Sequence, residues 1–103
     1  MDLLQIIAEP RRRQILAMVW DSELAAGEIA ARSDVTFGAV SQHLAVLREA
    51  RLVAVRKEGN RRYYRADKEQ LGALRPVLEE MWASTIDRLA ETIEADLTAG
   101  TPE

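Results

Sequence analysis

Apolar residues recur at helical spacing through the first third of the chain. A short apolar segment predicts a first helix over residues 2–8, and Pro10 is well placed to begin a second helix because proline is favoured in the first turn. The second helix is expected over residues 11–20 and a third over residues 27–32. Residues 33–35 then interrupt the apolar pattern, so a tight turn is predicted after the third helix.

The most regular helical pattern follows that turn. Val40, Leu44 and Leu47 lie at positions i, i+4 and i+7, which places them on one face of a helix. Thr36 is a favoured N-cap residue, because its hydroxyl can accept a hydrogen bond from the first turn. The pattern therefore predicts an amphipathic helix of about four turns over residues 36–50.

The period then changes from that of a helix to that of a strand. Residues 52–57 and 61–65 are rich in Val and Tyr, and the segment 58–60 between them contains Gly and Asn, as turns do. A β-hairpin over residues 52–65 is therefore expected. Tyr63 and Tyr64 should alternate across this hairpin, with one packing on the core and the other lying on the surface.

The last part of the chain is again helical in pattern. Asp67 can act as a cap, and one long helix is expected over residues 68–98, with Pro76 as a possible bend. Its apolar positions are Leu71, Leu74, Leu78, Trp82, Ile86, Leu89, Ile93 and Leu97.

The order of these elements predicts a mainly α fold with a β-hairpin wing, in a single domain over residues 1–103. Helices joined by a tight turn and followed by a basic hairpin are typical of the winged helix-turn-helix. In that architecture one helix enters the major groove of DNA and the hairpin lies along the backbone.

The distribution of charge supports a polyanionic partner. The chain has 103 residues and a net charge of −3, but residues 32–68 carry nine basic and four acidic side chains. Such a local excess of cations indicates a surface for nucleic acid or for another acidic partner, although a solvated face of mixed charge is the more common cause of a single cluster.

Composition excludes several other classes of function. Without cysteine there is no disulfide, no thiolate metal site and no cysteine nucleophile, and His43 is the single histidine. No apolar run is long enough for a membrane span, and the apolar start precedes its cations, the reverse of a secretory signal. We therefore expect a cytoplasmic protein.

The outer face of the helix predicted over residues 36–50 is small and polar, so it can approach base edges closely. Gln42 can pair with adenine, Ser41 can bond to several bases, and Ala45 can touch a thymine methyl group. An ordinary solvated helix face would have the same composition; the neighbouring basic hairpin favours DNA. The residues expected to read bases are Phe37, Gly38, Ser41, Gln42 and Ala45.

Cations cluster around the turn of the hairpin, where DNA phosphates would be their counterions. Edge strands also carry Lys and Arg to prevent aggregation, which is the alternative explanation. The residues expected to contact the DNA backbone are Thr36, Arg48, Arg56, Lys57, Arg61 and Arg62.

Four motifs together resemble the ArsR/SmtB family of winged-helix transcriptional repressors. They are EPRRRQIL at residues 9–16, GEIA at 27–30, VSQHLAVLREARLV at 40–53 and EGNRRYYR at 58–65. The resemblance covers nearly the whole chain. It implies a homodimer built from the first and last helices, which presents two reading helices to a palindromic operator and represses transcription.

The apolar stripe of the last helix is larger than a small core can cover, which also predicts a dimer. A symmetric pair of chains would bury this stripe together with part of the first helix. The expected interface residues are Leu3, Ile6, Leu74, Leu78, Trp82, Ile86, Leu89 and Ile93.

The chain departs from the metal-sensing members of that family. It lacks the cysteines of the third helix and the Asp and His pairs of the last helix, and the carboxylates of the last helix have no imidazole beside them. We therefore expect no metal site and no cofactor, and His43 is expected to be a partly buried structural group. The sequence does not identify an effector.

Arg11, Arg12 and Arg13 lie in the first turn of a predicted helix, where cations are unfavourable, so they should have an anion nearby. DNA phosphate and the acidic last helix are equally good candidates.

An enzyme is not expected. Ser41 and His43 are two positions apart on a helix and point in different directions, so they cannot act together as nucleophile and base. The stronger alternative to a sequence-specific repressor is a winged helix that binds another protein and has no specific DNA site.

Overall fold

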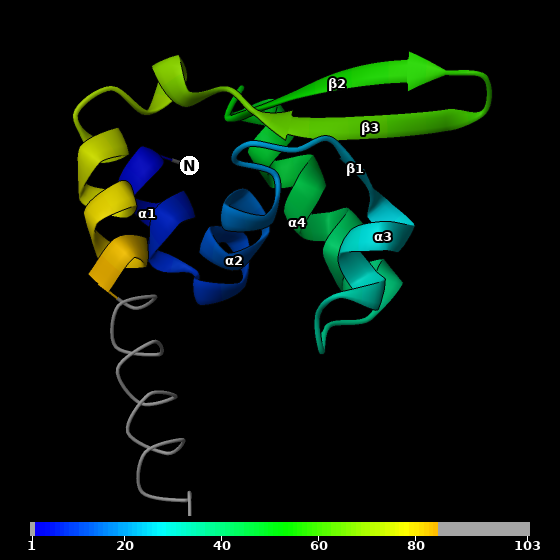
Figure 1. Ribbon diagram of the computed structural model, residues 1–103, viewed down its shortest axis with the longest axis horizontal. Helices are drawn as coiled ribbons and strands as arrows, with labels where there is room; N and C mark the ends of the chain where they lie inside the picture. Colours follow the sequence, from blue (N-terminus) through cyan, green and yellow to red (C-terminus); the bar gives the residue numbers. More distant parts are fainter. Residues whose placement is uncertain (1, 85–103) are drawn as a thin grey trace, which may run out of the picture. The chain divides into compact units, whose positions relative to one another are not determined.

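The computed structural model describes residues 2–84, which belong to two compact units, Met1–Gly72 and Ala73–Glu103. The first unit contains the helices α1 to α4 and a small sheet, and of the second unit the structure describes residues 73–84 (Figure 1). The predicted interface residues Ile86, Leu89 and Ile93 lie outside the described residues.

The helices of the first unit occur where the apolar pattern predicts them. They are α1 (Leu3–Ala8), α2 (Pro10–Met18), α3 (Ala26–Ala31) and α4 (Phe37–Glu49). Pro10 is the first residue of α2, as expected. The helix α2 ends at Met18, two residues before the predicted end.

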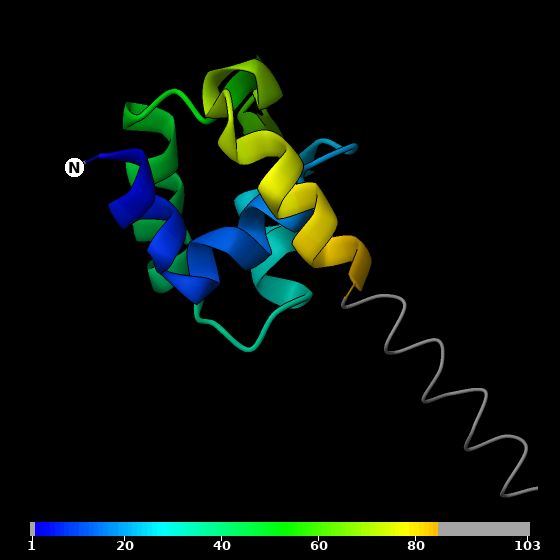
Figure 2. The same ribbon diagram turned by 90° about the vertical axis from the view of Figure 1, so that its left-hand side faces the viewer.

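Two arginines join α1 to α2, at the sharp turn of the chain between them that Figure 2 shows. Arg12 Nε donates to the carbonyl of Ile6 at 2.9 Å, and Arg13 Nη1 donates to the carbonyl of Ile7 at 2.7 Å. These carbonyls belong to the last turn of α1, where oxygens lack intrahelical donors and cations are favourable. Arg11 instead forms an ion pair with Asp34.

These contacts add partners that the sequence did not suggest. Arg12 and Arg13 lie against the negative end of the preceding helix, whose carbonyls accept their hydrogen bonds. The two predicted anions, DNA phosphate and the acidic last helix, stay predictions. A cation is unfavourable in the first turn of α2, but the same cation is favourable beside the C-terminal end of α1, and the second effect offsets the first.

Caps define where the two helices of the helix-turn-helix begin. Thr36 Oγ1 accepts a hydrogen bond from the backbone N–H of Ala39 at 3.2 Å and so starts α4. Ala25 has no side chain with which to cap α3. Glu28 compensates in part, because its carboxylate accepts the N–H of Ala25 at 2.9 Å.

The sheet has one more strand than the sequence predicts. The short strand β1 (Leu24–Ala25) pairs with β3 (Arg61–Ala66), which pairs with β2 (Val53–Glu58), all antiparallel, in the order β1-β3-β2. Gly59 takes a φ of +62° in the turn between β2 and β3, a conformation that glycine adopts without strain. We call the β2–β3 hairpin the wing.

The core of the first unit lies among α1 to α4 and the inner face of the sheet. Leu24 and Val53 contribute from the sheet, and Val40, Leu44 and Leu47 contribute one complete face of α4. The other fully buried side chains of this unit include Ile15, Leu16, Val19, Ile29 and Leu52.

The prediction of one helix over residues 68–98 is wrong at its start. Residues Lys68–Leu71 form a 3-10 turn, the side chain of Asp67 does not cap it, and Gly72 follows with a φ of +55°. An α-helix begins only at residue 74. Pro76 lies in its first turn, where a backbone N–H has no intrahelical partner, so proline is tolerated there and does not bend the helix.

No helix within residues 2–84 has the length and apolar character that crossing a lipid bilayer requires.

We predict that Thr36→Val destabilises the protein by about 1 kcal/mol, because it removes the hydroxyl that caps α4 and keeps the shape of the side chain. The free energy of unfolding, measured with urea, checks this value. Thr36→Ser keeps the hydroxyl and is the matched control. Equal stability of the Val and Ser variants would contradict a capping role.

Candidate nucleic-acid interface

The helix α4 separates its residues sharply into two faces. Val40, Leu44 and Leu47 are at most 1% exposed, which fixes the rotation of the helix in the first unit. All five predicted base-reading residues and Arg48 are exposed on the rest of its surface. They are Phe37, Gly38, Ser41, Gln42 and Ala45, and Phe37 is 58% exposed.

A groove of about 310 Å³ connects α4 with the wing. Phe37 and Ser41 line it from α4, and Asn60, Arg61 and Arg62 line it from the wing. The rest of the lining consists of Ala25 at the end of β1, Ala26 and Gly27 at the start of α3, and Tyr64 on β3. Figure 1 shows the wing extending past α4 on the side of α3, so base-reading and phosphate-binding candidates are brought to one surface.

The register of the wing divides its four predicted phosphate contacts between two faces. Lys57 lies opposite Arg62, and Arg56 lies two residues from Glu58 and opposite Tyr63. Because side chains alternate across a strand, Lys57 and Arg62 share the face of the buried Val53, while Arg56 and Arg61 share the outer face.

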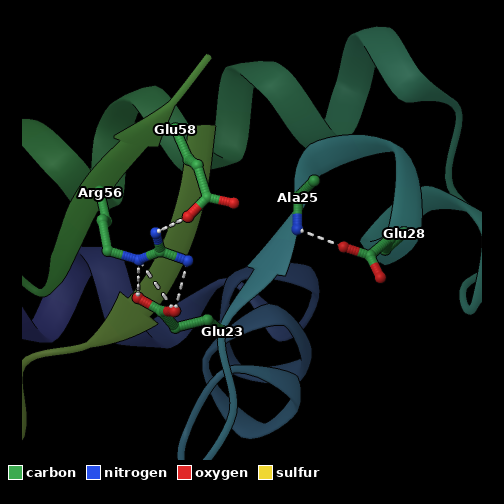
Figure 3. Close-up of polar contacts among 5 residues, drawn as sticks. All are labelled: Glu23, Ala25, Glu28, Arg56 and Glu58. Atoms are coloured by element: carbon green, nitrogen blue, oxygen red, sulfur yellow. Dashed lines mark hydrogen bonds and ion pairs between the residues drawn. The ribbon is translucent and has the colours of Figure 1, made fainter. Parts of the chain in front are cut away.

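On the outer face Arg56 already has two carboxylate partners (Figure 3). Its Nε lies 3.0 and 3.1 Å from the two oxygens of Glu23, and its Nη1 lies 2.9 Å from Glu58 Oε1. The guanidinium also lies over the ring of Tyr63, 4.9 Å from the centroid. The hydrogen bond from Arg56 lowers the pKa of Glu23, and the two carboxylates raise the pKa of Arg56.

On the other face Lys57 and Arg62 form a pair of like charges. Directly opposed cations destabilise an antiparallel pair of strands. No ion pair within residues 2–84 involves either of them. Arg61, on the outer face, likewise has no ion pair among these residues, so of the four predicted wing contacts only Arg56 is already paired with carboxylates within residues 2–84.

Comparison with known proteins agrees with this geometry. The sequence model of the family described as "Bacterial regulatory protein, arsR family" matches residues 9–55. The HTH-type transcriptional regulator Rv2034 of Mycobacterium tuberculosis is 40% identical over 92 residues, which are 89% of this chain and 86% of that protein. The chain belongs to the ArsR family.

Solved structures of similar proteins extend this result to the fold. Reduced HlyU from Vibrio cholerae shares 39% identity and a TM-score of 0.68, over 78% of this chain and 84% of that one. The Mycobacterium bovis protein Mb0332, whose structure is titled a homodimeric winged helix-turn-helix DNA-binding domain, shares 30% identity and a TM-score of 0.66, over 77% and 73%. This ArsR-family chain is thus a winged-helix, DNA-binding transcription regulator, and nothing in the comparisons supports the protein-interaction alternative.

The groove between α4 and the wing also contains residues that the sequence analysis did not select. Asn60 and the segment Ala25 to Gly27 line the groove beside Phe37. Asn60 was assigned only to a turn, and no local signal places the start of α3 against the wing. Tyr63 and Tyr64 lie on opposite faces of the wing, as expected, but both are half-buried.

The described interface candidates differ in how much surface they offer. In the first unit Leu3 is half-buried and Ile6 is 2% exposed, while Leu4, which was not predicted, is 68% exposed. In the second unit Leu74 and Trp82 are half-buried and Leu78 is buried. The exposed apolar residues of that helix are Val77 and Met81.

His43 is half-buried on α4, in agreement with the prediction. Within residues 2–84 no three His, Asp or Glu side chains come together to form a group that could hold a metal ion.

We predict that Lys57→Gln and Arg62→Gln each reduce the salt dependence of DNA binding. Losing one phosphate contact should lower the slope of log K against log salt by about 0.9 in magnitude. Arg65→Gln is the matched control, because Arg65 is an exposed cation on the outer face of the same strand as Arg62. The slopes follow from fluorescence-anisotropy titrations at several salt concentrations, and a slope that changes only in the Arg65 variant would reverse the assignment of the two faces.

Proposed function

We propose that this protein is a transcriptional repressor that binds a palindromic operator as a homodimer and acts in the cytoplasm. In each chain α4 would enter the major groove and the wing would follow the adjacent backbone. The observation that carries the proposal is the groove where Phe37 and Ser41 of α4 meet Arg61 and Arg62 of the wing.

The chemistry of the α4 surface fits the reading of base edges. Gln42 is exposed beside Ser41 and Ala45, and a glutamine amide can form two hydrogen bonds with adenine. Small neighbours let the helix backbone approach the groove floor. Thr36 and Arg48, near the two ends of the helix, would contact phosphates and fix its position along the duplex.

Repression would follow from occupancy. A dimer that covers two half-sites about one helical turn apart, roughly 34–36 Å, hides a stretch of promoter from RNA polymerase. Relatives carry both kinds of name, since the V. cholerae protein HlyU is called a transcriptional activator and the Agrobacterium fabrum relative is called a biofilm growth-associated repressor. Our proposal of repression therefore requires that the operator of this protein overlaps the promoter.

Gln42→Ala is expected to weaken binding to the specific operator by about 1–3 kcal/mol and to leave binding to random duplexes unchanged, because it removes a base contact and no charge. The operator is first located by footprinting DNA upstream of the gene, and affinities are then compared on that site. Gln14→Ala, an exposed glutamine on α2, is the control. An equal loss on random DNA would contradict base reading.

Val77→Glu is expected to convert the dimer into a monomer that no longer protects the operator. Val77 is 58% exposed, so the substitution should not disturb the folded chain, whereas a buried charge between two chains is costly. Sedimentation or light scattering gives the oligomeric state. Ala83→Glu, at an exposed position of the same helix, should remain dimeric. A Val77→Glu dimer with full operator affinity would remove this helix from the interface.

A further inference from the structure

The side chain of Arg56 crosses the sheet from one edge to the other. It extends from the edge strand β2, its guanidinium lies over Tyr63 on the central strand β3, and it binds Glu23, which immediately precedes β1 on the far edge. Three of its nitrogens are engaged: Nε and Nη2 lie about 3.0 Å from Glu23 oxygens, and Nη1 binds Glu58. We call Glu23, Arg56, Glu58 and Tyr63 the outer clamp, and Figure 3 shows its three charged residues.

The backbone alone holds the wing to the rest of the sheet over a very short distance. The strand β1 has two residues, and it pairs with β3 only at Leu24 with Tyr64 and Ala25 with Tyr63. Beyond Tyr63, towards the tip, β2 and β3 pair only with each other, at Lys57 with Arg62 and Glu58 with Arg61. The outer clamp sits at this boundary, where a small change in angle would displace the tip most.

The negative charge of Glu23 is unexpected beside a DNA-binding wing. A carboxylate beside the wing repels DNA, so on electrostatic grounds alone it weakens binding. Its position is explained if it holds the wing at the angle that α4 requires. We propose that Glu23 is a positioning residue for DNA binding, which acts through Arg56 to fix the wing relative to α4, and that Arg56 is a strut of the sheet instead of a phosphate contact.

This inference deepens the proposed function and rests on it, because it assigns roles within the same DNA surface. It replaces the earlier expectation that all four cations of the wing contact the backbone. Lys57, Arg61 and Arg62, which lie outside the clamp, keep that role.

Glu23→Gln separates positioning from electrostatics by the sign of its effect. The substitution removes a negative charge, so electrostatics alone predicts tighter binding to DNA. Loss of the clamp predicts weaker binding to the operator, by about two- to fivefold, the range of exposed ion pairs. Glu69→Gln makes the same change of charge at an exposed position of the 3-10 turn and is the matched control, for which we expect no weakening.

Arg56→Lys tests the other end of the clamp. Lysine keeps the charge but cannot present the planar fork that binds Glu23 and stacks on Tyr63. A strut predicts that Arg56→Lys loses as much operator affinity as Arg56→Gln, and that neither changes the salt slope. A phosphate contact predicts that Arg56→Lys binds nearly as well as the parent, while Arg56→Gln lowers the slope by about 0.9.

Both experiments use the full chain, its footprinted operator and thermal unfolding as a check of the fold. Tighter binding by Glu23→Gln, or a reduced salt slope for Arg56→Gln, would overturn the positioning role and leave the repressor proposal intact. Failure of the parent protein to select any site would overturn the repressor proposal itself. A lower affinity with an unchanged salt slope and an unchanged melting temperature supports the clamp.

Discussion

The DNA surface depends on the burial of one face of α4. Val40, Leu44 and Leu47 are removed from water almost completely, and turning the helix would expose them at a cost of about 1.5–3 kcal/mol for each side chain. Because this face is buried, Ser41, Gln42 and Ala45 point outward, and no contact made by these three residues is needed to orient them. Thr36 fixes where the helix begins, so Phe37 and Gly38 lie at its exposed start. The packing of the core therefore also determines which residues of α4 face outward.

The wing adds charge to this surface through its register. A shift of the pairing by one residue would exchange its two faces and bring Arg56 to the inner side. In the observed register Val53 and Leu24 are buried, which holds Lys57 and Arg62 on the inner face and leaves Arg61 and the clamp on the outer face. A chain with a net charge of −3 thus presents on its wing three cations, Lys57, Arg61 and Arg62, that lack an intramolecular carboxylate partner within residues 2–84.

Local patterns sufficed to predict α1 to α4, the wing and the outer face of α4, because each of these depends on periodicity and on capping residues close in sequence. Two features could not be obtained in this way. The strand β1 has two residues, too few for any period. The break at Gly72 is hidden because Leu71, Leu74 and Leu78 keep helical spacing across it. Its signs in the sequence are Gly72, which takes a positive φ, and Pro76, which is tolerated in the first turn of a helix. The partner of Arg56 lies 33 positions away in the sequence, so the division of the wing cations needed the fold.

The carbonyl contacts of Arg12 and Arg13 have a consequence for how the protein finds its site in a genome. The guanidinium groups of Arg12 and Arg13 are held against the end of α1, and Arg11 is paired with Asp34, so all three arginines are directed to partners within the chain. In our proposal the contacts with DNA phosphates come instead from α4 and the wing. Chromosomal DNA offers a very large number of competing sites, and a regulator that adheres weakly to all of them keeps a larger free fraction for its operator.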